Sequence, residues 1–156
     1  MAAKPGDRPF QFSKAELYVA PASGGEPVKV SGTLVTNKDG VLIGRVTGFK
    51  WSPDATRLAF RADKEVVTGF ELYVAPAAGR TEPFKVSGTQ VFGGDVGLFS
   101  WSPDGSRLAF FADKEIDEWT DLFVVTAAEG AEPVKPTEVV APDSYGRELT
   151  WSPLSN

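Results

Sequence analysis

The sequence predicts an all-β protein made of β-propeller blades, and three observations lead to this prediction. Trp-Ser-Pro stands at residues 51–53, 101–103 and 151–153, so a unit of fifty residues repeats. Each unit contains short runs rich in β-branched and aromatic residues, separated by turns with Pro and Gly. The run at 122–125, Leu-Phe-Val-Val, is apolar on both faces, which favours a strand covered on both sides, as in stacked blades. A β-sandwich, the alternative architecture, usually alternates apolar and polar residues and needs no fixed repeat.

Each unit is expected to hold four short antiparallel strands. In the third unit we expect these strands at 98–101, 107–111, 122–125 and around 133–135. The turn after the first strand is Ser-Pro-Asp-Gly, in which Pro fixes φ at the second position and Gly suits the fourth. The second blade spans 45–89 and the third spans 95–139, while 8–33 supplies the last three strands of the first blade.

The motif WSPDGSRLAF followed by DLFVV resembles the WD40-like (PD40-type) repeat of TolB-type β-propellers. The resemblance covers nearly the whole chain, and three copies keep one register. It implies six-bladed rings that mostly bind proteins or sit beside a catalytic domain. Because propellers serve many roles, the resemblance is informative about the fold and much less so about the function. The last copy, at 151–156, departs from the motif because it lacks the Asp-Gly turn.

Three blades are too few for a closed ring, because propellers close with about four to eight blades. The strand expected at 146–151 has the sequence of a first strand and would complete the blade at 8–33 of a second chain. We therefore expect the chain to be its own partner, in a head-to-tail homodimer that forms one six-bladed ring. The alternative is that the chain is a piece of a longer propeller.

The composition excludes several classes of function. The net charge of −5 provides no basic field for nucleic acid, and no apolar run is long enough to span a membrane. The chain has no Cys and no His, which excludes disulfides, thiolate chemistry, histidine metal ligands and the Ser-His-Asp relay. We expect no cofactor and no metal. The first residues lack the apolar core of a signal peptide, which fits a cytoplasmic protein or a piece of a periplasmic or extracellular one.

Residues that repeat in every copy are expected to be structural. Trp51, Trp101 and Trp151 are predicted to pack between blades, because identical placement is what packing requires. Asp54 and Asp104 are explained by the geometry of their turns. The acidic segments 63–65 and 113–115 are candidates for calcium binding or acid–base chemistry, but we expect them to be solvated turns.

Residues that differ between copies are the candidates for binding, because packing favours sameness whereas binding tolerates difference. Six residues before each Trp-Ser-Pro stand three chemically unlike residues on a loop expected near the central channel. Trp119 replaces Gly69 of the previous copy, and it is either a contact residue or a lid on the blade edge. The predicted contact surface consists of Lys38, Asp39, Arg45, Asp95, Trp119, Tyr145 and Arg147.

The sequence therefore predicts a non-catalytic scaffold that binds a protein or a peptide through the loops around the channel. One alternative is a structural piece whose only partner is another copy of itself. The other is a hydrolase or lyase that uses carboxylates such as Asp95, although no convergent pair of acids is evident in the sequence.

Overall fold

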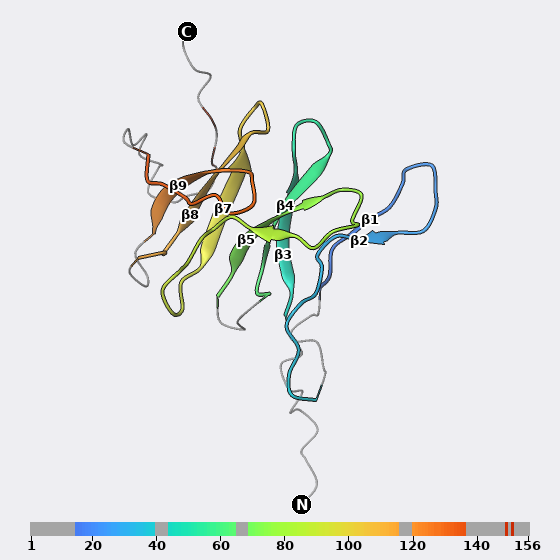
Figure 1. Cartoon of the computed structure of the whole chain (residues 1–156), viewed down its shortest axis with the longest axis horizontal. Coiled ribbons are helices and arrows are strands. Elements are labelled where there is room, and N and C mark those ends of the chain that lie inside the picture. The colour runs from blue at the N-terminus through green and yellow to red at the C-terminus, as the bar shows by residue number, and fades with distance from the viewer. Residues whose placement is uncertain are drawn as a thin grey trace, which may run out of the picture.

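Three antiparallel sheets make up the computed structural model, which describes residues 15–39, 44–64, 69–115, 120–136, 149 and 151 (Figure 1). None of the sheets closes on itself, and the described residues contain no helix, so the all-β prediction is confirmed. The first sheet pairs β1 (Tyr18–Val19) with β2 (Val28–Lys29). The second is a meander of β3 (Val46–Trp51), β4 (Arg57–Ala62), β5 (Glu71–Pro76) and β6 (Phe84–Lys85), and the third joins β7 (Val96–Trp101), β8 (Arg107–Ala112) and β9 (Asp121–Thr126).

The second and third sheets repeat one architecture. Trp51 pairs with Leu58 between β3 and β4, and Trp101 pairs with Leu108 between β7 and β8. The strands predicted at 98–101, 107–111 and 122–125 lie within β7, β8 and β9. The fourth strand predicted around 133–135 is reduced to a bridge between Val124 and Val134. Residues 8–14, where the first blade is predicted to begin, lie outside the described residues, as does most of 146–151.

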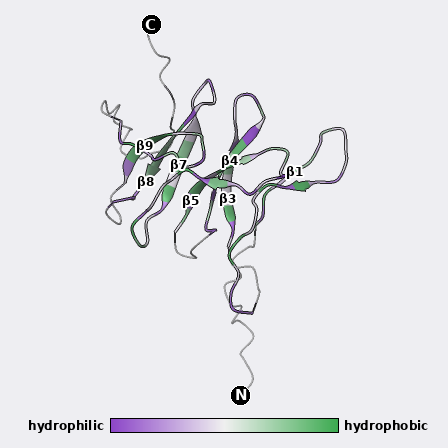
Figure 2. Ribbon diagram, in the orientation of Figure 1, coloured by the Kyte–Doolittle hydropathy of each residue, from purple (hydrophilic) through white to green (hydrophobic). Residues whose placement is uncertain are grey.

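Strands β4 and β5 of the second sheet are buried on both faces, because they alternate their side chains between two hydrophobic cores. On one face, Phe60 and Tyr73 share a core with Leu17 and Val30, which flank the strands of the first sheet. The opposite face, which includes Val74, packs against the third sheet. Hydrophobic colour accordingly gathers on the strands in Figure 2. The apolar run of β5 is thus covered on both sides, as its third-unit counterpart was expected to be.

Candidate functional site

A tryptophan joint connects successive sheets. The indole Nε1–H of Trp101, at the end of β7, donates to the carbonyl oxygen of Lys50 on β3 at 3.1 Å. The Arg57 guanidinium from β4 lies over the Trp101 ring, with 5.1 Å between its Cζ and the ring centroid. Because Arg57 also donates to the carbonyl oxygens of Gly105 at 2.6 Å and Ala127 at 2.9 Å, it ties the second sheet to the third.

The same joint recurs fifty residues later. Trp151 Nε1–H donates to the carbonyl oxygen of Ser100 at 3.3 Å, and Arg107 lies over its ring at 5.1 Å. Trp151 is half-buried, and it occupies the position on the third sheet that Trp101 occupies on the second. Trp101 and Trp151 therefore make the same two contacts with the preceding sheet.

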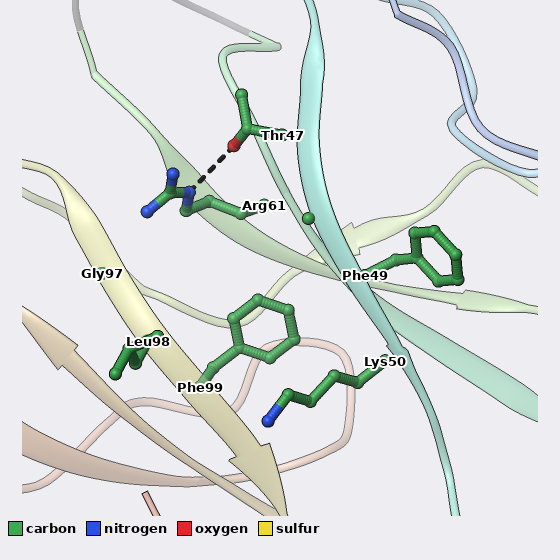
Figure 3. Close-up of a pocket in the computed structure, with 8 residues that line it drawn as sticks. Thr47, Phe49, Lys50, Arg61, Gly97, Leu98 and Phe99 are labelled. Atoms are coloured by element: carbon green, nitrogen blue, oxygen red, sulfur yellow. Dashed lines mark hydrogen bonds between the residues drawn. The ribbon is translucent and has the colours of Figure 1, made fainter. Parts of the chain in front are cut away.

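The third of these tryptophans, Trp51, stands on an uncovered face of β3. Trp51 and Phe49 are 42 % and 53 % exposed, whereas their counterparts Trp101 and Phe99 are 7 % and 6 % exposed. The Phe49 ring points away from β7, on the opposite side of β3 (Figure 3). The sequence at these positions is nearly the same, so the difference in burial arises because no sheet of the described chain covers this side of β3.

The aspartates of the Trp-Ser-Pro-Asp segments hold their turns together, as predicted. Asp54 accepts hydrogen bonds from the Ser52 hydroxyl at 2.6 Å and from the backbone N–H of Thr56 at 3.1 Å. Asp104 accepts the equivalent bonds from Ser102 and Ser106 at 2.6 and 3.0 Å. These hydrogen bonds, the serine hydroxyl first, lower the pKa of each carboxyl to about 2.

The two turns should make stability depend on pH at the acid end. A carboxyl with a pKa of about 2 in the folded chain and near 3.8 when unfolded contributes stability above pH 4, which is lost as the pH falls toward 2. We expect the melting temperature to fall less steeply between pH 4 and 2 in the double variant Asp54→Asn/Asp104→Asn than in the wild type. Asp39→Asn, in another exposed turn, is the control. An unchanged slope in the double variant would assign the acid sensitivity to other groups.

The acidic segment at 63–65 differs from its prediction. The solvated-turn interpretation is wrong at Asp63, which is buried and accepts a hydrogen bond from the backbone N–H of Arg45. Burial raises the pKa of this carboxyl, against the opposing effect of its backbone hydrogen bonds. Asp113 holds the backbone N–H of Asp95 in the same way. These aspartates therefore fix the loop that enters β3 or β7, and they do not form an open acid pair.

Two of the predicted contact residues, Arg45 and Asp95, also serve the fold. The Asp95 carboxylate accepts the backbone N–H of Phe70 at 2.7 Å, and the Arg45 guanidinium lies over the Phe70 ring at 5.2 Å. Lys38 and Asp39 are exposed in a turn, where the Asp39 N–H donates to Asn37 Oδ1 at 3.0 Å. Three other predicted residues lie outside the described part of the chain: Trp119, Tyr145 and Arg147.

A pocket that the sequence did not predict lies between β3 and β7, with a volume of about 230 Å³. Lys50, Arg61 and Phe99 converge on it from three strands (Figure 3). The Arg61 guanidinium is held by the Thr47 hydroxyl at 2.9 Å and the Val96 carbonyl oxygen at 2.9 Å. The pocket is lined by Thr47, Gly48, Phe49, Lys50, Arg61, Gly97, Leu98 and Phe99.

Other kinds of site were sought over the same residues. Among the described ranges, no three Asp or Glu side chains gather as a metal site would require. No helix in these ranges could span a membrane. A comparison with protein-family models and with curated protein sequences finds no match.

Proposed function

We propose that the chain is a non-catalytic half-propeller of the TolB type. Its sheets are blades, and two copies close head to tail into a ring of six blades that binds a protein or a peptide at the loops around its channel. Asp95, the residue on which an enzymatic alternative would depend, has its carboxylate occupied by the Phe70 N–H, which favours the scaffold.

The observation that carries this proposal is the tryptophan joint, which the described residues make at Trp101 and Trp151 but not at Trp51. A joint needs a backbone carbonyl one residue before a Trp-Ser-Pro and an arginine on the following strand. By the fifty-residue spacing, residue 150 of a second copy stands where Lys50 and Ser100 stand in the two joints that are made. A second copy therefore carries the missing acceptor for Trp51.

A second copy that covers the Trp51 face of β3 would also remove apolar surface from water. Phe49 and Trp51 are large side chains on one face of β3, and Tyr18 of the first sheet is likewise about half exposed. Exposed apolar patches of this kind mark interaction surfaces in soluble proteins. Each copy would offer the Trp51 indole as a donor and the residue-150 carbonyl as an acceptor, so two copies can complete each other's joints.

The mass of the purified protein tests the ring. Sedimentation at micromolar concentration should give the mass of two chains. Trp51→Ala should shift the population to single chains with unchanged circular dichroism. Because a buried interface tryptophan typically contributes about 2 kcal/mol or more and the ring has two such joints, the dissociation constant should rise by nearly a thousandfold or more, on the order of 4 kcal/mol.

Phe92→Ala is the control for the loss of an aromatic side chain, since Phe92 is exposed and takes part in no joint. It should leave the mass of two chains unchanged. A folded wild-type protein that sediments as one chain at tens of micromolar would refute the ring.

A further inference from the structure

We infer that the pocket between β3 and β7 binds a carboxylate, such as the acidic side chain of a bound peptide. This inference rests on the proposed function, because it names the ligand chemistry of a site on the strands that would line the channel. Three features support it: the charge of the pocket, its open space and the absence of its two cations from the next copy.

The charge of the pocket is opposite to that of the chain. Lys50 and Arg61 bring two cations to the pocket, and its lining residues include no carboxylate, although the whole chain carries a net charge of −5. Within the described residues the Lys50 ammonium has no ion pair, and it lies 6.0 Å from the centroid of the Phe99 ring. A carboxylate that binds the Lys50 ammonium would gain a charge-assisted hydrogen bond, which is stronger than a neutral one, and Arg61 adds a second positive charge to the same pocket.

Two glycines line the pocket, and a side chain at either position would cause no steric clash. Gly48 has no positive φ, and a Cβ built on it would meet no atom within 4 Å. At Gly97 the nearest atom to such a Cβ is the Phe111 carbonyl oxygen at 3.6 Å, which is an ordinary contact. Glycine inside a strand often marks a bulge or a place where a ligand or another backbone approaches closely. The pairing register shifts beside both glycines, between Val46 and Gly48 and between Val96 and Phe99, and the missing side chains leave the pocket open to a ligand.

The next copy lacks the two charges. Ser100 stands fifty residues after Lys50, and Phe111 stands fifty residues after Arg61. The joint at Trp151 forms all the same, so sheet stacking does not require the cations. The volume of about 230 Å³ corresponds to roughly eight waters, which suits one acidic side chain with its apolar stem against Phe99.

The test is a titration followed by the amide signals of Gly48 and Gly97 in the NMR spectrum of the whole chain. The probe is the peptide N-acetyl-Gly-Glu-Gly-amide, and its Gln counterpart is the control. The Glu peptide should shift both signals with a dissociation constant of about 1 mM, because a few charge-assisted hydrogen bonds are all it forms. Free glutarate distinguishes the source: equal binding indicates a small dicarboxylate, and weaker binding indicates a peptide.

Three variants sharpen the result. Lys50→Met should raise the dissociation constant about tenfold, and Gly48→Val should abolish the shift at Gly97 by filling the pocket with a residue that suits a strand. Lys38→Met removes the same charge from an exposed turn and should change nothing. All residues that line the pocket come from one chain, so the Trp51→Ala variant should bind the Glu peptide as the wild type does. The experiment therefore tests the pocket independently of the dimeric ring. Equal shifts with the Gln peptide, or unchanged binding in Lys50→Met, would overturn the assignment.

Discussion

Replacing Trp101 by alanine should lower the free energy of unfolding by about 3–5 kcal/mol, the usual range for removing a buried tryptophan. The Trp101 ring lies in the core between the second and third sheets, so its loss opens a cavity at the junction. It also leaves the Lys50 carbonyl without its indole donor and Arg57 without the ring beneath it. The effect should therefore weaken the stacking of whole sheets as well as the packing of one side chain.

Denaturation by urea measures this change, and Trp101→Phe separates its two parts. Phenylalanine keeps most of the apolar ring but cannot donate to Lys50, so its cost should be nearer the roughly 0.5–1.5 kcal/mol net contribution of one hydrogen bond. Phe92→Ala, at an exposed aromatic, should stay within about 0.5 kcal/mol of the wild type. A loss below about 1 kcal/mol for Trp101→Ala would mean that the two sheets are not held together by this joint.

Replacing Gly79 by alanine should cost about 2–4 kcal/mol. Gly79 has a φ of +62°, a conformation that costs an L-residue about 1–2 kcal/mol. An added Cβ would also stand 2.5 Å from Val28 Cγ1 and 2.7 Å from the Lys29 carbonyl oxygen, both on β2. Because one of these atoms belongs to the backbone, relief requires the first and second sheets to move apart, as in an overpacked core.

Gly130→Ala is the matched control for this prediction. Gly130 has a φ of +76° in the corresponding turn of the next unit, and a Cβ there would meet no atom within 4 Å. The Gly130→Ala variant should lose only the stability that the unfavourable backbone conformation costs. Thermal denaturation should therefore show a clearly larger loss of stability for Gly79→Ala. Equal losses would indicate that the contact between the turn at Gly79 and β2 does not constrain the two sheets.

Much of the fold could be predicted because the apolar runs and turn residues that recur in each unit indicate which segments are buried strands and which are turns. An apolar run such as that of β5 has to be covered on both faces, and the structure covers it with two cores. The Ser-Pro-Asp turns could be predicted for a local reason, since their hydrogen bonds join residues two to five apart in sequence. Predictions of this kind succeed because the interactions that decide them lie within one unit.

The candidate site was less predictable because long-range contacts decide it. Asp63 resembles a loop acid, yet it is buried because the loop entering β3 folds back over it and donates the Arg45 N–H. Variation between copies singled out Arg45 and Asp95, but chemical difference does not reveal which way a side chain points. The pocket required knowing that Lys50 and Arg61 face the neighbouring strand β7, which depends on how two sheets stack. The one available signal was the loss of both charges in the next copy.

The tryptophan joint also bears on how such a chain can arise. Each unit carries a donor toward the unit before it and an acceptor toward the unit after it, so duplication of the coding segment supplies both halves of every new junction at once. Adding a unit therefore requires no matching mutation elsewhere. A substitution in one unit affects only the contacts with its immediate neighbours. This locality explains how Lys50 and Arg61 could diverge from Ser100 and Phe111 while the scaffold around them stayed the same.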